Sequence, residues 1–197
     1  FFFNRPQQMV TGQVTAPRIE LANEDLIRAH VYAIWLAASG LDLKSRMTEI
    51  LETDGESPSL ELRQSVEDDL AKPSTRSDAK KRATEVLATM ADDLSKTDWW
   101  DDEWIERTVE AVTEAFKKSC RRWRSLFLAA QRQFDESSRI MRDAARSAQD
   151  KKRAASLQTE ARNQLALLTQ ESTGSLSQSD FYTYRYFASE GFLPGYS

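Results

Sequence analysis

Apolar residues recur along the second half of the chain with the spacing of a long amphipathic helix. From position 105 they follow alternating steps of four and three residues, which is typical of a heptad seam. The seam comprises Ile105, Val109, Val112, Phe116, Ser119, Trp123, Leu126 and Ala130, and after a stutter Phe134, Ser137, Met141, Ala144 and Ala148. Neither Gly nor Pro occurs in residues 74–173. The pattern predicts a helix over 102–148, about 70 Å long at roughly 1.5 Å per residue.

The apolar stripe changes phase at the segment AQDKKR, residues 148–153. The next stripe is formed by Ala154, Leu157, Ala161, Leu165 and Leu168. At about 100° per residue it lies roughly opposite the face that carries Met141 and Ala148. The chain therefore either turns back here as an antiparallel helical hairpin or continues as one long helix with a new partner. We favour the hairpin, because helices of about seventy residues are rare.

The first half of the chain begins with a predicted core helix over 24–38. Asn23 and the two acidic residues after it form an N-cap and an acidic first turn, and Gly40 ends the helix. Apolar residues surround this helix almost completely, which indicates a central position. Its one histidine, His30, is expected at the edge of the core with a hydrogen-bond partner.

Three shorter helices are predicted between the core helix and the long one. Their expected ranges are 44–52, 59–71 and 76–95. Pro73 is expected to end the second of them. Thr97 or Asp98 is the expected cap of the long helix, with acidic residues in its first turn.

Both ends of the chain are unusually apolar for termini. Residues 1–22 contain two Pro and one Gly, which predicts an extended segment. Residues 173–197 begin as a Ser-rich linker, and a short helix is expected over about 181–189, although alternating Tyr also suits a strand. Seven residues there are aromatic: Phe181, Tyr182, Tyr184, Tyr186, Phe187, Phe192 and Tyr196. We expect both ends to continue into a longer protein, and the aromatic segment to pack back onto this chain, dock on a neighbouring domain, or both.

Together these elements define an all-α fold class. We expect an elongated helical bundle with a long antiparallel helical hairpin and extended termini. Its organisation comprises an extended leading segment over 1–22, a helical domain over 23–172, and a linker with an aromatic segment over 173–197.

The composition excludes most catalytic and metal sites. One cysteine, Cys120, and one histidine form neither an internal disulfide nor a zinc site. There is no Gly-rich phosphate loop and no G-x-S-x-G motif. Acidic residues stand next to one another on predicted helices, so they fan out around them. We therefore predict no catalytic residue, metal site or cofactor in this chain. The longest apolar run, 31–38, is also far shorter than the roughly 20 residues of a membrane helix.

Charge is distributed unevenly along the long helical element. Residues 85–114 carry ten acidic and two basic residues, a net charge of −8 in a chain whose total is −4. The segment 117–124 that follows has five basic residues and no acidic one. Such a basic face can hold a phosphate backbone. The candidate nucleic-acid contacts are Lys117, Lys118, Arg121, Arg122 and Arg124, followed by Arg139, Arg142 and Arg146. Lys151, Lys152 and Arg153 extend this second basic stretch.

The basic face of 117–124 can also be solvated or paired within the chain. Glu114 can pair with Lys118 in the favourable order along a helix, and the acidic segment VEDDL, residues 66–70, could lie against the face. In that case the face holds no nucleic acid. The alternative function is a helical interaction or oligomerisation module, in which the seam 105–130 pairs with another protein or a second copy.

Two stretches near the ends resemble a known family. They are MVTGQVTAPRIELANEDLIRAHVYAIWLA, residues 9–37, and FYTYRYFASEGFLPGYS, residues 181–197. Both are similar to segments of large bacterial DEAD/DEAH-box-like ATP-dependent helicases of the phage-defence, DISARM-type kind. The similarity covers about 46 of the 197 residues, and the residues between the stretches carry no motif of the family.

The resemblance implies a helical accessory domain downstream of a helicase motor, in a cytoplasmic protein that acts on DNA. ATP and Mg²⁺ are expected for the motor of the parent protein and not for this chain, because no position here matches the residues that bind them. The implied partners are DNA, neighbouring helicase domains and a partner subunit, and no membrane. The type of nucleic acid, the unwinding polarity and the oligomeric state do not follow from the sequence.

Overall fold

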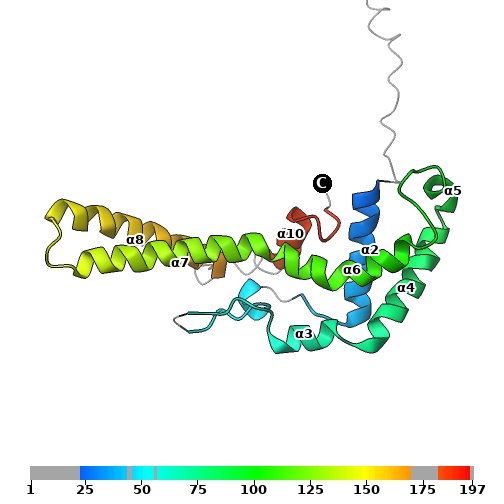
Figure 1. Cartoon of the computed structure of the whole chain (residues 1–197), viewed down its shortest axis with the longest axis horizontal. Coiled ribbons are helices and arrows are strands. Elements are labelled where there is room, and N and C mark those ends of the chain that lie inside the picture. Colours follow the sequence, from blue (N-terminus) through cyan, green and yellow to red (C-terminus); the bar gives the residue numbers. More distant parts are fainter. Residues whose placement is uncertain (1–22, 44–45, 56, 170–181, 196–197) are drawn as a thin grey trace, which may run out of the picture.

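The computed structural model describes residues 23–43, 46–55, 57–169 and 182–195. Within these ranges the chain is helical between its loops, and one isolated antiparallel bridge joins Leu51 and Leu62. The all-α fold class is confirmed. Figure 1 shows an elongated molecule in which a long helical hairpin extends from a compact helical body. The expected extended segment over 1–22 and the linker over 173–181 lie outside the described residues.

The body is built from three helices that pack against one another: α2 (Glu24–Ser39), α4 (Pro73–Ala88) and α6 (Trp104–Ser119). Helix α2 contributes Val31 and Trp35 to the core, which are 0% and 3% exposed. Helix α4 contributes two fully buried alanines, whose small side chains allow close approach of its neighbours. The central position predicted for the first helix is therefore confirmed.

The ends of α2 follow their sequence signals. The side chain of Asn23 accepts a hydrogen bond from the Leu26 N–H at 3.0 Å, and Gly40 ends the helix with φ of 70°. A left-handed residue at this position is most easily supplied by glycine. His30, in contrast, is exposed, so its expected place at the edge of the core is wrong.

The chain between α2 and α4 is less helical than predicted. A single 3-10 turn, η1 (Met47–Glu49), replaces the helix expected over 44–52, and only α3 (Gln64–Leu70) forms within 59–71. Between η1 and α3 the two backbone segments pair with each other, and the Glu52 N–H donates to the Glu61 carbonyl at 2.8 Å. Burial of the surrounding apolar residues, Met47, Ile50, Leu51, Leu60 and Leu62, stabilises this arrangement over local helix propensity.

The helix expected over 76–95 is displaced and divided. Helix α3 ends before Pro73, as expected, and Pro73 also takes the first position of α4, where its missing N–H costs nothing. Helix α4 stops at Ala88, and a short helix, α5 (Ala91–Leu94), follows. The cap expected at Thr97 or Asp98 is also wrong, because α6 begins only at Trp104.

A cluster of tryptophans accounts for the late start of α6. The rings of Trp99, Trp100 and Trp104 lie with their centroids between 5.1 and 5.8 Å apart. The carboxylate of Asp101 then accepts a hydrogen bond from the Glu103 N–H at 2.9 Å. Packing of the indoles therefore holds residues 99–103 in a loop before the helix.

The long helix predicted over 102–148 is broken. Helix α6 ends at Ser119 and α7 (Arg121–Arg142) begins after Cys120. The chain turns at residues 143–147, and α8 (Ala148–Thr169) runs back along α7. The antiparallel hairpin is therefore confirmed, although the turn precedes the segment 148–153 where the apolar stripe changes phase.

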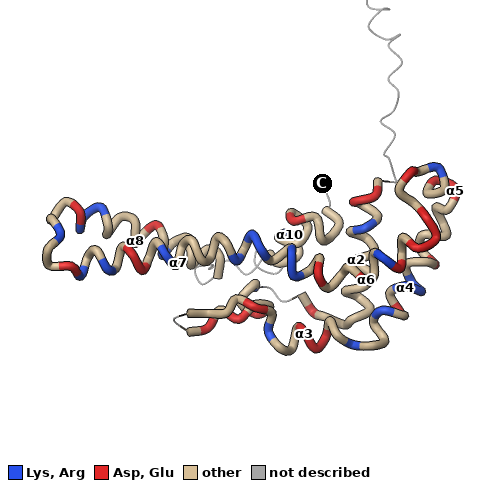
Figure 2. The backbone as a smooth tube through the Cα atoms, in the orientation of Figure 1, with Lys and Arg blue, Asp and Glu red and all other residues tan. Residues whose placement is uncertain are grey.

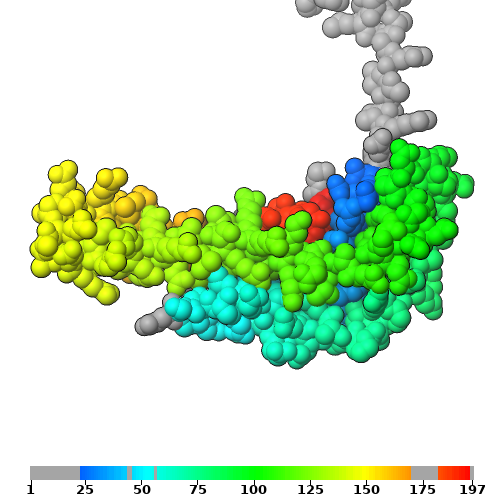
Figure 3. Space-filling model, viewed as in Figure 1, coloured from blue at the N-terminus to red at the C-terminus, as the bar shows by residue number. Residues whose placement is uncertain are grey.

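The aromatic C-terminal segment packs back onto the body. Helix α10 (Tyr182–Ser189) lies beside the junction of α6 and α7, and Figure 3 shows it seated between the root of the hairpin and α2. The ring of Phe187 stacks on Phe116, and the ring of Phe192 stacks on Tyr32, each with centroids 4.9 Å apart. Both Phe187 and Phe192 are at most 2% exposed. Packing within the chain accordingly accounts for these two rings.

Candidate nucleic-acid interface

The hairpin of α7 and α8 is held together by small buried side chains. The residues at this contact are Ala130 and Ser137 of α7 with Ala154 and Ala161 of α8, all at most 3% exposed. Two glutamines add bonds between the helices: Gln133 donates to the Leu157 carbonyl at 3.3 Å, and Gln158 donates to the Ser138 hydroxyl at 2.7 Å. Small side chains let the helices lie close, so the hairpin is a narrow projection.

The turn of the hairpin is fixed by side chains that cap the backbone. The carboxylate of Asp143 accepts from the Ala145 N–H at 2.9 Å. The hydroxyl of Ser147 accepts from the Asp150 N–H at 3.1 Å and donates to the Asp150 carboxylate at 2.7 Å. These bonds satisfy N–H groups at the start of α8. A Ser followed three residues later by an acid is a recognisable start signal, and it would have located the turn from the sequence.

The end of the hairpin carries a concentration of positive charge, which we call the basic tip. Residues 139–153 contain six basic and two acidic residues, a net charge of +4. The basic residues are Arg139, Arg142, Arg146, Lys151, Lys152 and Arg153. All of them except the half-buried Lys151 are exposed. Figure 2 shows these charges gathered where α7 and α8 meet, at the far end from the body.

Acidic neighbours engage only part of the basic tip. Arg139 pairs with Glu136 at 2.7 Å, and Arg146 lies 3.5 Å from Asp143. Among the described residues, Arg142, Lys152 and Arg153 have no acidic group within 4 Å. The tip therefore presents cations whose charge is not neutralised by the part of the chain that the structure describes.

The other predicted contacts, in 117–124, lie at the root of the hairpin and are mostly used within the chain. Lys117 is 3.4 Å from Glu67 of α3, so the segment 66–70 does lie against the basic face. Arg122 is 3.3 Å from Glu190. A nucleic acid at the root would have to compete with these acidic partners.

Arg124 has a structural role that the sequence did not indicate. Its Nε donates to the Leu60 carbonyl at 2.7 Å, and its side chain is 20% exposed. Leu60 adopts a φ of 56°, which is unusual for a residue other than glycine. The guanidinium therefore fastens a strained loop to α7. Arg124 and Leu60 are 64 positions apart, so no local sequence pattern indicates this contact.

Lys118 and Arg121 complete the root. Both are exposed or half-buried at the surface, and within the described part of the chain neither has an acidic partner within 4 Å. The pair expected between Glu114 and Lys118 is absent from these contacts. Lys118 instead borders a pocket of about 300 Å³ between α2, α6 and the end of α10.

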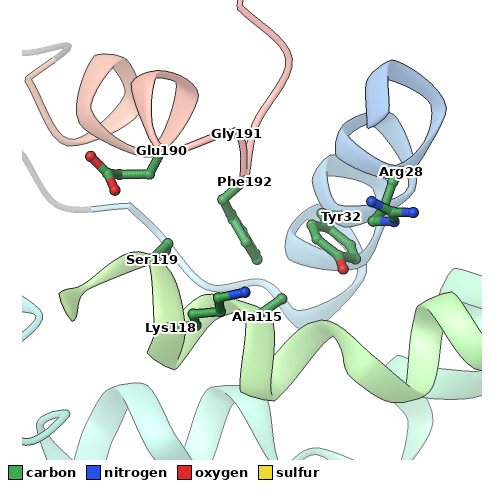
Figure 4. A pocket seen from close by; sticks show the side chains of 8 residues that line it. All are labelled: Arg28, Tyr32, Ala115, Lys118, Ser119, Glu190, Gly191 and Phe192. Atoms are coloured by element: carbon green, nitrogen blue, oxygen red, sulfur yellow. The ribbon is translucent and has the colours of Figure 1, made fainter. Parts of the chain in front are cut away.

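Figure 4 shows how this root pocket is lined. Phe192 points toward Tyr32 across it, Lys118 approaches from α6, and Glu190 lies on the opposite side beside Ser119. Arg28 borders the pocket but is held by Glu24 and by Asp25, the latter at 2.7 Å. Because both signs of charge are present and largely paired, the pocket shows no strong preference for an anion.

Some acidic residues of the body are paired with its own cations. Arg107 holds the carboxylate of Asp101 with two bonds of 2.6 and 2.9 Å, and the hydrogen bonds from Arg107 lower the pKa of Asp101. Lys80 contacts Glu106, and that bond lowers the pKa of Glu106. Both acids are therefore charged at neutral pH, and the segment 85–114 that contains them keeps a net charge of −8.

Two negative findings concern the described ranges. No helix there is both long and apolar enough to cross a membrane. No three His, Cys, Asp or Glu side chains in those ranges come together as a metal site.

The fold and the charged surface define an all-α protein with a projecting, basic hairpin. No protein-family model, curated protein or solved structure matches this chain.

Proposed function

We propose that the chain is a non-catalytic accessory domain of an ATP-dependent DNA helicase, and that the basic tip of its hairpin contacts the nucleic acid. The observation that supports the proposal is a set of exposed cations, without acidic partners among the described residues, at the end of a projecting hairpin. Helix α7 has 22 residues, so the tip stands about 33 Å beyond its root at roughly 1.5 Å per residue. A motor domain next to the body would leave the tip free to reach a nucleic acid strand.

The parent protein supplies the remaining parts of the proposal. ATP and Mg²⁺ would be bound by motor domains outside this chain, in the cytoplasm, where the similarity of the end stretches leads us to expect them. The body would position the hairpin relative to that motor. A phosphate loop encoded upstream in the same reading frame would support this arrangement. A parent reading frame without such a loop would contradict it.

The alternative function, an interaction module that pairs through the seam 105–130, is less well supported. The large apolar side chains of the seam, Val112, Phe116 and Trp123, are at most 1% exposed because they pack within the body and against α10. A second protein could reach them only by opening the fold. Nucleic-acid contact through the tip is therefore the better-supported proposal.

A matched pair of charge reversals tests the contact. The dipeptide Lys152-Arg153 lies in the tip, and Lys81-Arg82 lies exposed on α4 in the body. The variant Lys152→Glu/Arg153→Glu is expected to lower DNA affinity about tenfold or more at roughly 0.1 M salt, because it removes two cations from the phosphate contact. Fluorescence anisotropy with labelled single- and double-stranded DNA measures the change.

The control Lys81→Glu/Arg82→Glu changes the net charge equally but lies on the acidic body. Its affinity for DNA is expected to stay within about threefold of the wild type, because charges beyond roughly 10 Å are screened at 0.1 M salt. Equal losses in the two variants would show that net charge, and not the tip, determines binding, and the proposal would then be wrong.

A further inference from the structure

The basic tip carries no aromatic side chain. Residues 135–164, which include the tip and the adjoining turns of α7 and α8, contain no Phe, Tyr, Trp or His. Phe134, the nearest aromatic residue of α7, is half-buried, and the guanidinium of Arg162 lies 5.8 Å from the centroid of its ring. Proteins that bind single-stranded nucleic acid stack its bases on aromatic side chains. The tip therefore lacks the surface on which unpaired bases would stack.

The cations of the tip that have no acidic partner among the described residues come from both helices. Arg142 is the last residue of α7, whereas Lys152 and Arg153 lie in the second turn of α8. All three are exposed, and Figure 2 shows basic positions on both helices at this end. Neighbouring residues of a helix point about 100° apart, so Lys152 and Arg153 do not form one row with Arg142. A single strand that runs along either helix could therefore meet only some of these cations.

The spacing of the two helices suits the two strands of a duplex. The axes of packed helices lie about 8–10 Å apart, and the long side chains of Arg and Lys extend this reach to each side. The major groove of B-DNA is about 12 Å wide. The cations of α7 and α8 can thus reach phosphates on opposite sides of one groove, whereas a single strand offers one backbone to both helices.

The same spacing keeps the hairpin out of the groove itself. A helix is about 10–12 Å across with its side chains, so two packed helices are about 20 Å across and wider than the major groove. The narrower turn offers Ala144 and Ala145, and its one basic residue, Arg146, lies 3.5 Å from the Asp143 carboxylate. These residues give few contacts with base edges, so phosphates and not base sequence dominate the contact.

We propose that the basic tip binds the backbone of duplex DNA across one groove, with cations of α7 on one strand and cations of α8 on the other. This inference rests on the proposed function, because it specifies which form of DNA the same tip contacts. Binding depends on the phosphates and on salt, and it is independent of the base sequence. The domain would accordingly hold the paired part of the helicase substrate.

Two DNA probes with equal numbers of phosphates test the preferred form. One is a labelled duplex of about two helical turns, and the other is a labelled strand of thymidines, which does not pair with itself. Fluorescence anisotropy of the wild-type chain at roughly 0.1 M salt is expected to show at least about tenfold tighter binding to the duplex. The variant Lys152→Glu/Arg153→Glu should lose this preference.

The outcomes separate this inference from the proposed function. Equal or tighter binding to the single strand, weakened in Lys152→Glu/Arg153→Glu, would overturn the inference and leave the proposed function standing. A duplex preference that persists in this variant would arise outside the tip and would overturn the inference as well. If neither probe binds the wild-type chain, the proposed function fails together with the inference.

One variant on each helix tests whether both helices take part. Arg142→Gln removes a cation from α7 and Arg153→Gln removes one from α8. Each is expected to weaken duplex binding about fivefold or more at roughly 0.1 M salt, because each loses one phosphate contact. Arg82→Gln, exposed on α4 of the body, is the control and should bind within about twofold of the wild type. A loss in only one of the two tip variants would overturn contact through both helices.

Duplexes of different sequence test the backbone contact. An A·T-rich, a G·C-rich and a mixed duplex of one length should bind within about threefold of one another, because their phosphates are the same. Met141 is the large apolar side chain exposed at the tip, at 39%, and Met141→Ala should bind the duplex like the wild type. A preference above about tenfold for one sequence, or a similar loss in Met141→Ala, would show contact with the bases and overturn the inference.

Discussion

The hydroxyl of Tyr186 satisfies two backbone hydrogen-bonding groups where α6 and α7 meet. It donates to the Ser119 carbonyl at 2.6 Å and accepts from the Trp123 N–H at 3.1 Å. A break between helices leaves such groups without partners, and α7 has no capping bond from Cys120. Burial raises the pKa of Tyr186 far above its ordinary value, so the hydroxyl keeps the proton that it donates.

Removal of this hydroxyl should destabilise the whole fold. Tyr186→Phe leaves a buried carbonyl and a buried N–H unsatisfied, and we expect a loss of about 1–3 kcal/mol in the free energy of unfolding. Urea denaturation followed by circular dichroism measures it. Tyr184→Phe is the matched control, since its hydroxyl bonds to the Pro194 carbonyl at 2.8 Å and does not bridge the α6–α7 junction, and it should cost about 1 kcal/mol or less. Equal costs in the two variants would contradict the role of Tyr186.

Because of Cys120, the free energy of unfolding should fall at alkaline pH. It is fully buried, and burial raises the pKa of its thiol from 9.0 to about 11. The unfolded thiol ionises near its ordinary pKa, so its contribution to stability is complete below about pH 9 and is lost as pH rises toward 11. The loss amounts to at most about 3 kcal/mol, at 1.36 kcal/mol for each pKa unit.

The variant Cys120→Ala isolates this contribution. Its free energy of unfolding should fall less between pH 9 and 11 than that of the wild type. The difference between the two urea series reports the thiol, including its electrostatic effect on Tyr186. Identical pH profiles would show that the thiol does not titrate differently in the folded state.

Single residues were predictable where their signals are local. Asn23 and Gly40 fix the ends of α2 through their own chemistry, and both were found from the sequence. Ser147 carries a similar local signal that the phase of the apolar stripe concealed. The roles of Arg124 and Tyr186 depend on partners more than 60 positions away, so no pattern near them indicates the contact.

At the level of elements, the hairpin depends on small residues at its contact. Ala154 and Ala161 of α8 are at most 2% exposed against α7, and their size sets the distance between the helices. The apolar stripe on α8 predicted this contact face correctly. It could not place the turn or the break at Cys120, because a heptad pattern continues unchanged through a short interruption.

Enlarging one of these residues should separate the helices. Ala161→Leu adds three carbons to a closed contact, and we expect it to cost about 1–3 kcal/mol in the free energy of unfolding. Ser156→Leu introduces the same side chain on the exposed side of α8 and should change stability by about 0.5 kcal/mol or less. Thermal unfolding of both variants makes the comparison. Equal midpoints would contradict close packing of α7 and α8.

The whole molecule separates its charges between the two ends. The body carries the acidic segment 85–114, with a net charge of −8, whereas the tip has a net charge of +4 and holds cations without an acidic partner among the described residues. The sequence revealed this gradient along the chain. It did not distinguish the root from the tip, because Lys117 and Arg122 find their acidic partners only in the folded protein.

The salt dependence of DNA binding tests the role of the tip most directly. Each phosphate that is neutralised on duplex DNA contributes about −0.9 to the slope of log affinity against log salt. With Arg142, Lys152 and Arg153 in contact, we expect a slope of about −3 or steeper, which the Lys152→Glu/Arg153→Glu variant reduces by about two. A wild-type slope near zero, or an unchanged slope in the variant, would contradict nucleic-acid contact through the basic tip.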